Sequence, residues 1–339
     1  MRNAYLPKSR ELSNKLRMWW FLSWFAWCNL TFSVSAELIG LNYYESTLSR
    51  ELSLEENNHD SLLLPFNKTR IPGSIESEQI QEFLASHFTA LNGNWSIESD
   101  VFEENGFTFT NMVFSLGNAE SPLILAAHYD SKILPEGFIG GMDSAAPCAI
   151  LLYIAKFVDT ILQKDEFLLD PLLLDRFSGL KIVFFDGEEA INQWAADDSI
   201  YGARHLASKW ETDGTLDSIE LLVLLDLLGS EEHVQVPSYY PASHEYYELL
   251  ATIEQKHTKQ FQDGFTFLDP ANHIFLMHGK VVIEDDHIQF LERDVPVLHL
   301  IPFPFPSAWH TINDNFDNLS EKSIHRWAML LCEFVVQYY

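Results

Sequence analysis

Basic side chains are scarce in this sequence of 339 residues: 21 Lys and Arg stand against 49 Asp and Glu, which gives a formal net charge of −28. Nucleic-acid binding depends on clusters of Lys and Arg that contact phosphates, so the deficit excludes that class of partner. It also disfavours binding to an anionic membrane surface. We therefore expect no nucleic-acid partner and no membrane partner, unless the amino-terminal segment is an anchor.

Cysteine is also rare, with only Cys28, Cys148 and Cys332. Three cysteines make neither a disulfide framework nor a four-cysteine zinc site, so a metal site would have to use histidine and carboxylate ligands. Glycine (15) and proline (14) are few, and 47% of the residues are apolar. This composition excludes disordered and collagen-like chains and suffices for a large hydrophobic core.

The first 36 residues have the pattern of a leader. Residues 2–17 carry five basic side chains and one acid, and an apolar stretch over 18–36 ends in Val34-Ser35-Ala36. A basic segment, an apolar segment and small residues at the end predict a secretory signal peptide over 1–36. An uncleaved signal anchor stays open, because the apolar stretch has 19 residues and is near the minimum to span a bilayer.

The leader sets the expected localisation. We expect passage through the secretory pathway and secretion, with Golgi-anchored or mitochondrial localisation as the alternatives. Three Asn-X-Ser/Thr sequons lie beyond the leader, at Asn67, Asn94 and Asn318, and agree with the secretory route and with glycosylation.

The rest of the chain divides into a polar, irregular extension over 37–75 and one domain over 76–339. Within the domain, apolar residues recur at helical spacing over 76–92 and alternate over 106–116, as in a half-buried strand. Four continuous apolar runs are typical of strands buried on both faces: 123–127, 180–185, 220–228 and 295–301. Helical patterns cover 145–162, 199–209, 243–256 and 321–338. This alternation predicts a single-domain α/β sandwich with a central mixed, mostly parallel β-sheet flanked by helices.

Charged side chains follow each of the buried runs. The carboxyl ends of parallel strands share one edge of a sheet, so these side chains are expected to lie together. Zinc accepts both imidazole and carboxylate ligands. For single residues a structural explanation stays open, because Asp143 could cap the helix that begins near residue 145, and Asp186 could act similarly. The candidates are His128, Asp130, Asp143, Glu188, Glu189, Asp226 and His310.

The adjacent acids Glu188 and Glu189 are more informative. Two neighbouring carboxylates just after a buried strand repel each other, and a bound cation or a shared proton would relieve the repulsion. One could bind a metal while the other acts as a base, which is the division that metal-assisted amide chemistry requires.

Six segments in order resemble the animal glutaminyl-peptide cyclotransferases (glutaminyl cyclases), a family that shares the zinc exopeptidase-like fold of the M28 aminopeptidases. The resemblance extends from about residue 76 to the carboxyl terminus. The segments are 128–132 (HYDSK), 143–148 (DSAAPC), 184–190 (FFDGEEA), 198–206 (DSIYGARHL), 284–287 (EDDH) and 295–310.

The resemblance implies one zinc ion per chain, held by Asp143, Glu189 and His310. It implies that Glu188 is the general acid and base, and that Asp226 and Asp285 form a hydrogen-bonded pair near the substrate amine. The implied wall around the substrate consists of Trp194, Ile283, Phe305 and Trp309, with His299 behind the acidic pair. From the residues alone, His299 is equally well explained as an ordinary buried strand histidine, and Ile283 as a structural residue.

The family's reaction converts the N-terminal glutamine of a peptide or protein to pyroglutamate and releases ammonia, by an intramolecular acyl transfer. We therefore expect an enzyme, a zinc-dependent acyltransferase, whose partners are peptides with N-terminal glutamine and which acts as a monomer.

Two other functions stay open. In an M28-type two-zinc aminopeptidase, His128 and Asp226 would hold the second metal. A catalytically silent, secreted binding protein would lack bound zinc. The fit of 284–287, Trp194 and Trp309 to the cyclases favours the first interpretation. The chain departs from secreted relatives at a cysteine pair that brackets the site, because Ala127 occupies the first position. We therefore expect Cys148 to be free and buried.

Overall fold

A computed structural model of the chain describes residues 41–117, 123–163, 177–257, 264–274 and 283–339. The predicted leader over 1–36 lies outside the described residues. The chain divides into two compact units, 1–46 and 47–339. Of the first unit, only the start of helix α2 (Leu41–Glu51) is described. The second unit contains the sheet and all the candidate site residues.

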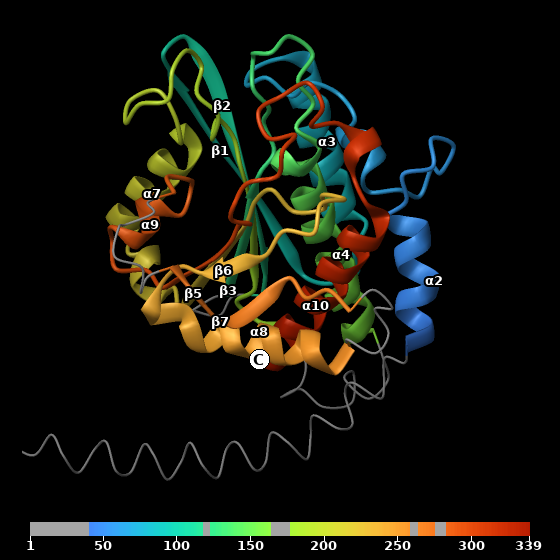
Figure 1. The fold of residues 1–339 in the computed structure, drawn as a ribbon. Helices are drawn as coiled ribbons and strands as arrows, with labels where there is room; N and C mark the ends of the chain where they lie inside the picture. Colours follow the sequence, from blue (N-terminus) through green and yellow to red (C-terminus); the bar gives the residue numbers. More distant parts are fainter. Residues whose placement is uncertain (1–40, 118–122, 164–176, 258–263, 275–282) are drawn as a thin grey trace, which may run out of the picture. The chain divides into compact units, whose positions relative to one another are not determined.

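A six-stranded mixed sheet forms the centre of the second unit (Figure 1). Neighbouring strands β4, β3, β5 and β8 are parallel, and β1 and β2 extend this sheet in antiparallel pairs. The strand order is β1-β2-β4-β3-β5-β8. The bounds are β1 (Trp95–Glu104), β2 (Phe107–Leu116), β3 (Leu123–His128), β4 (Lys181–Phe185), β5 (Leu221–Leu225) and β8 (Val297–Leu300). The predicted mixed, mostly parallel sheet is confirmed.

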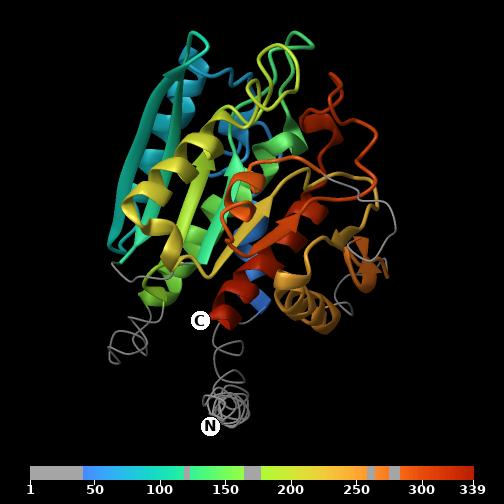
Figure 2. The same ribbon diagram turned by 90° about the vertical axis from the view of Figure 1, so that its left-hand side faces the viewer.

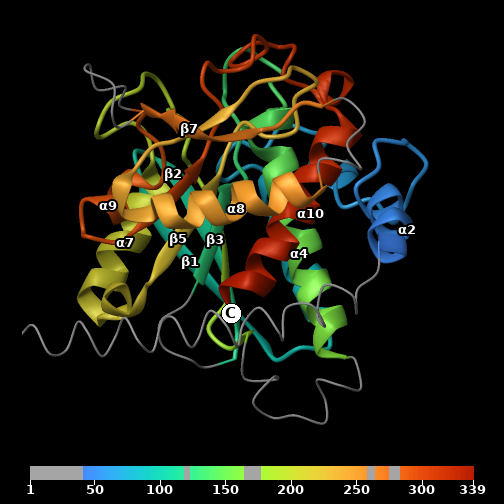
Figure 3. The ribbon, with the colours of Figure 1, turned by 60° about the horizontal axis from the view of Figure 1, so that its bottom comes forward.

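Helices cover both faces of this sheet, which explains why the four parallel strands are almost continuously apolar. One face carries α3 (Ile75–Thr89), α4 (Ala146–Leu162) and α10 (Glu321–Tyr338), and the other carries α7 (Tyr201–Asp213) and α9 (Ile288–Leu291), as Figures 1 and 2 show. Helix α8 (His244–His257) lies beside α10 (Figure 3). These helices confirm the predicted sandwich and the five predicted helical segments.

Helix α4 is almost entirely apolar because it packs against the sheet and α10. Within the described part of the chain, the helical stretch Gly141–Leu162 is the one that is long and apolar enough to cross a membrane. Most of that stretch is buried inside the fold, as expected for a core helix.

The predicted irregular extension over 37–75 needs correction in its described part. Residues 41–51 form α2, a short 3-10 helix, η1, covers Leu64–Phe66, and residues from Thr47 onward belong to the same unit as the sheet. Leu63 and Phe66 are fully buried. Between α2 and α3, the buried side chains of Leu63 and Phe66 come from a bend and from η1, and only the tertiary fold brings them into the core.

Strand β1 and the small parallel sheet of β6 (Val236–Ser238) and β7 (Leu268–His273) were not predicted. β1 is an edge strand whose side chains are mostly exposed, so its sequence lacks an apolar pattern. β6 and β7 are short and each contains a proline, Pro237 and Pro270. Their pairing depends on neighbouring segments rather than on propensity.

The topology places four loops at one edge of the sheet. The chain leaves β3, β4, β5 and β8 at their carboxyl ends, and these strands are parallel. Helix α4 connects β3 to β4 on one face, whereas α7 connects β4 to β5 on the other. This change of face leaves a crevice at the carboxyl ends, where ligand sites of α/β sheets form.

Candidate active site

Asp143, Glu189 and His310 meet at this edge. Nε2 of His310 lies 3.5 Å from Oδ2 of Asp143 and 3.6 Å from Oε1 of Glu189. Both carboxylate oxygens are buried and have no hydrogen-bond partner among the described residues. One donor atom from each side chain therefore faces the same small volume, and the three atoms lie within 4.8 Å of one another.

The second oxygen of each carboxylate is already occupied. Oδ1 of Asp143 lies 3.0 Å from Nε2 of His128, and Oε2 of Glu189 accepts from Nζ of Lys132 at 3.0 Å. Each acid thus has one oxygen held by a basic neighbour and one oxygen left toward His310. Two buried carboxylate oxygens and an imidazole nitrogen, with no proton donor between them, fit a divalent cation such as zinc.

Local backbone conformations direct these three side chains. Asp143 precedes α4 and follows Gly140, which has φ of 63° and where a Cβ atom would lie 2.0 Å from the carbonyl oxygen of Asp143. Glu189 follows β4, and His310 has φ of 55° in the loop after β8. No side chain caps α4, and the carboxylate of Asp186 accepts from the amide of Thr110 at 2.8 Å. The two capping explanations are therefore wrong.

His128 joins a second group of acids next to the first. Its Nδ1 lies 3.3 Å from Oδ1 of Asp130, and its Nε2 lies 3.6 Å from Oδ1 of Asp226 in addition to its contact with Asp143. Burial alone would lower the pKa of His128, but hydrogen bonds with Asp130, Asp143 and Asp226 raise it well above its ordinary value. Asp226 also accepts from the hydroxyl of Ser144 and from the amide of Leu227. Both ring nitrogens of His128 and Oδ1 of Asp226 thus have partners within the protein.

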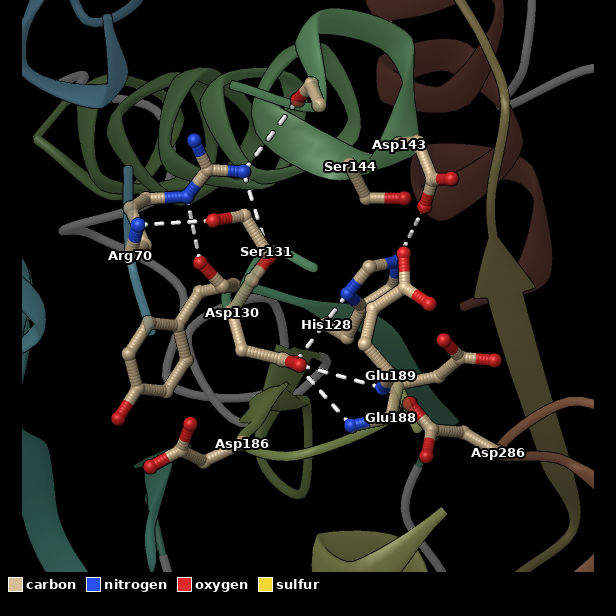
Figure 4. A network of polar contacts seen from close by, with 12 residues as sticks. Arg70, His128, Asp130, Ser131, Asp143, Ser144, Asp186, Glu188, Glu189 and Asp286 are labelled. Carbon is tan, nitrogen blue, oxygen red and sulfur yellow. Dashed lines mark hydrogen bonds and ion pairs between the residues drawn. The ribbon is translucent and has the colours of Figure 1, made fainter. Parts of the chain in front are cut away.

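Asp130 fixes the backbone of the acidic pair Glu188 and Glu189. Its carboxylate accepts from the amide of Glu188 at 3.1 Å and from the amide of Glu189 at 3.2 Å, and Figure 4 shows it between these amides and the ring of His128. The end of β3 thereby fixes the turn that follows β4. The sequence marked Asp130 as a candidate ligand, but this supporting role was not predicted.

Glu188 is 6% exposed and lines a pocket of about 570 Å³. Burial raises the pKa of its carboxyl group well above the ordinary value, the charges of Glu189 and Asp285 raise it further, and His128 opposes the shift. Asp143, Asp226 and His310 line the same pocket. The pocket therefore combines two residues of the three-donor group, Asp143 and His310, with a separate carboxylate.

The apolar side chains expected around a substrate also line this pocket: Trp194, Ile283, Phe305 and Trp309. The rings of Phe305 and Trp309 meet at 4.6 Å, and Trp309 stacks on His310 at 4.0 Å. An aromatic wall thus stands directly beside the donor group.

Asp285 and His299 lie behind the pocket and do not line it. Nε2 of His299, on β8, lies 2.7 Å from Oδ2 of Asp285, and both residues are buried. Burial and the charge of Asp226 raise the pKa of Asp285, whereas its hydrogen bond with His299 lowers it. His299 therefore contacts the acid that the family resemblance assigned to it.

Residues without a predicted role complete the site. Lys132 lies within a segment that carried the family resemblance, yet its pairing with Glu189 was not foreseen. Asp198 accepts from three consecutive amides, those of residues 191–193, which line the pocket. An acid a few residues after a polar loop is the signal that could have identified Asp198. Nothing local identifies Arg70 and Asp314, which hold the backbone before Asp143.

Cys148 is free and fully buried, as predicted, and its thiol donates to the carbonyl oxygen of His128 at 3.1 Å. Burial raises the pKa of the thiol to about 12. Cys148 therefore packs as a small apolar residue, and its thiol belongs neither to the three-donor group nor to the group around His128.

Comparisons with known proteins identify the family of the chain. Residues 111–335 match the model of peptidase family M28. An uncharacterized protein of Saccharomyces cerevisiae is 48% identical over 300 residues, which cover 82% of this chain and 83% of that protein. The glutaminyl-peptide cyclotransferase of Drosophila melanogaster is 38% identical over 307 residues, which cover 86% of this chain and 82% of that protein.

A solved structure is similar over the same region. The crystal structure of Macrostomum lignano glutaminyl cyclase has a TM-score of 0.71 and 34% identity, and the match covers 82% of this chain and 87% of that chain. The chain belongs to peptidase family M28, and within it to the glutaminyl-peptide cyclotransferases.

Proposed function

We propose that this protein is a zinc-dependent glutaminyl-peptide cyclotransferase. It converts the N-terminal glutamine of peptides and proteins to pyroglutamate and releases ammonia. The observation that carries the proposal is a pocket lined by the separate acid Glu188, by an aromatic wall, and by Asp143 and His310, whose donor atoms lie within 4.8 Å of a donor atom of Glu189.

Zinc held by Asp143, Glu189 and His310 would act as a Lewis acid on the γ-carboxamide carbonyl of the glutamine. The fit rests on the two orphaned carboxylate oxygens and on the imidazole nitrogen that faces them. We propose one zinc ion per chain, because both ring nitrogens of the neighbouring His128 and Oδ1 of Asp226 already have partners within the protein.

Glu188 moves the proton in this scheme. The α-amine of the substrate, with an ordinary pKa of about 7.7–8.0, must lose a proton before its nitrogen attacks the γ-carbon. Glu188 lines the pocket, takes a second proton from that nitrogen as the ring bond forms, and delivers it to the departing ammonia. The C–N bond of the new ring forms and the bond to the amide nitrogen breaks, so no water is consumed.

Asp226 and Asp285 orient the amine. Asp226 lines the pocket beside Glu188, and Asp285 lies behind it against His299. A buried carboxylate attracts the positively charged α-amine of the incoming peptide and holds it near Glu188. His299 supports this arrangement from β8.

The aromatic wall favours cyclisation over hydrolysis. Both reacting groups belong to one glutamine, so the enzyme mainly has to hold that side chain folded back on itself. Trp194, Phe305 and Trp309 provide rigid apolar surfaces for this, and they also keep water away from the carbonyl carbon.

An assay of the purified full chain tests the proposal against the M28 aminopeptidase alternative. Ammonia release from a peptide with N-terminal glutamine should be chelator-sensitive and should return with added zinc. A matched peptide with N-terminal leucine should not be cleaved. Release of leucine without ammonia release from the glutamine peptide would establish an aminopeptidase instead. Absence of bound zinc together with absence of both reactions would support a binding protein.

We also propose that the protein enters the secretory pathway. The asparagines of the three sequons beyond the predicted leader, Asn67, Asn94 and Asn318, are exposed, so attached glycans would not disrupt the core. Glycosidase treatment of the protein from its native cells should reduce its apparent mass. An unchanged mass, together with fractionation in mitochondria, would favour the mitochondrial alternative.

A further inference from the structure

Arg70 is a charged side chain in the core that contacts the backbone on both sides of the site. It is fully buried, and within the described part of the chain it forms no ion pair with a carboxylate. Instead, its guanidinium donates to six carbonyl oxygens over 2.6–3.3 Å. These belong to Phe66, Lys68, Tyr129, Asp130, Ile139 and Gly140.

The six carbonyls come from three separate segments. Residues 129 and 130 follow β3, and the carboxylate of Asp130 accepts from the amides of Glu188 and Glu189. Residues 139 and 140 lead into Asp143. Figure 4 shows Arg70 beside Asp130 and Ser131, with Asp143 farther along the same network. One side chain therefore connects the backbone of the acidic pair to the backbone that carries Asp143.

Asp314 holds the same segment from its other side. Its carboxylate Oδ1 accepts from the amide of Met142 at 2.8 Å, and its carbonyl oxygen accepts from the amide of Gly141 at 3.1 Å. Asp314 is buried and lies four residues after His310. The carbonyl oxygens of residues 139 and 140 thus accept from Arg70, and the amides of residues 141 and 142 donate to Asp314.

This arrangement counteracts the repulsion between the carboxylates of Asp143 and Glu189. In the absence of a cation, Asp143 and Glu189 repel each other, and their unpartnered oxygens would relax away from His310. Bonds from a charged group to buried backbone atoms are stronger than neutral ones and hold the chain in place. The backbone of 139–142 is therefore fixed independently of the metal.

We propose that Arg70 and Asp314 are positioning residues, which together form a two-sided clamp on 139–142 that preorganises the metal site. The proposal rests on the zinc site of the proposed function, and it assigns a site role to residues that lie outside the predicted ligands and wall. Neither residue lines the pocket or contacts the substrate.

Arg326 provides a matched control. It is also a buried arginine, at 4% exposure, and it bonds Glu254 at 3.0 Å and the carbonyl of Phe265 at 2.7 Å, away from the site residues. Arg70→Lys and Arg326→Lys both keep the positive charge and lose the planar fork. Asp314→Ala removes the acceptor for Met142, whereas Asp314→Asn keeps an amide oxygen there.

The experiment uses the full chain and measures zinc dissociation into excess chromogenic chelator, with thermal midpoints recorded in parallel. Arg70→Lys and Asp314→Ala should speed zinc loss by about tenfold or more, as for groups that support metal ligands. Asp314→Asn should stay near the wild-type rate. Arg326→Lys should lower the midpoint without changing zinc loss. Equal acceleration in Arg70→Lys and Arg326→Lys, or wild-type rates in both clamp variants, would overturn the proposal.

A second readout does not depend on zinc. In the metal-free protein, amide hydrogen exchange at Gly141 and Met142 should accelerate in Arg70→Lys but not in Arg326→Lys. If Arg70→Lys does not fold, Asp314→Ala and Asp314→Asn decide the question. If the wild-type chain binds no zinc, the zinc proposal fails, and unchanged exchange in the clamp variants would still refute the clamp separately.

Discussion

The indole Nε1 of Trp194 donates a hydrogen bond to Oε2 of Glu284 over 2.8 Å, and both residues line the pocket. The bond connects the wall after β4 to the segment that carries Asp285. Glu284 is exposed, so its charge stands at the entrance, where residues after the N-terminal glutamine would lie. Among the described residues, Lys132 is the one Lys or Arg that lines this pocket, and it pairs with Glu189.

This entrance charge predicts a preference for basic residues after the glutamine. Glu284→Gln keeps an acceptor for Trp194 and removes the charge. A unit charge at contact distance in water contributes about 1 kcal/mol, so the ratio of kcat/KM for Gln-Arg over Gln-Ala peptides should fall about fivefold at low salt. Glu136→Gln, an exposed acid that does not line the pocket, should leave the ratio unchanged. An unaltered ratio in Glu284→Gln would show that the charge of Glu284 does not set this preference.

Substitution of the general acid Glu188 and substitution of the metal ligand His310 should differ in their effect on zinc content. Glu188→Gln should lower turnover by about 10²–10⁴-fold, the contribution of a positioned general acid and base, while zinc content stays normal. His310→Ala should lose both turnover and zinc, because it removes a donor from the three-atom group. Metal analysis and ammonia release on the same preparations check both results. Near-normal cyclisation by Glu188→Gln would show that another group moves the proton.

Asp198 should govern substrate binding through the loop at 191–193. Its carboxylate accepts from three amides at 2.9–3.1 Å, and Tyr201 donates to it at 2.7 Å. Asp198→Ala should loosen the wall next to Trp194 and raise KM more than it lowers kcat, with zinc content unchanged. Asp213→Ala removes a comparable acceptor, for the amide of Thr215, outside the pocket and serves as the control. A KM equal to that of the control would contradict the prediction.

From the burial of His87, which lies outside the candidate site, we predict that the stability of the protein depends on pH. Burial lowers its pKa from 6.5 to about 4, and its Nε2 lies 3.0 Å from the carbonyl oxygen of Leu152. The unfolded chain binds the proton more readily than the folded one, so the free energy of unfolding should decrease as pH falls from 6.5 to about 4. His87→Gln keeps a donor for Leu152 and should flatten this part of the curve in denaturant titrations. An identical curve for the variant would refute the assignment.

Much of the fold was predictable from the sequence because its signals are local. Helix α4 and strands β3, β4 and β5 are defined by apolar runs of characteristic length, and their predicted bounds agree with the structure to within a few residues. The exposed edge strand β1 and the turn-rich chain around Phe66 carry no such pattern, because their places depend on the segments they pack against.

The candidate site divides in the same way. The sequence by itself determined which residue types stand at the strand ends, and the carboxyl-end rule for parallel strands predicted that the charged candidates would lie together. The family resemblance, not that rule, singled out Asp143, Glu189 and His310 as the ligand set. Only the tertiary structure decided which oxygen of each acid stays unpartnered, and that Arg70 and Asp314 hold the backbone beside them. Residue types and their periodicity are properties of the linear sequence. Distances between atoms at positions 70, 143 and 314 depend on how the whole sheet and its helices pack.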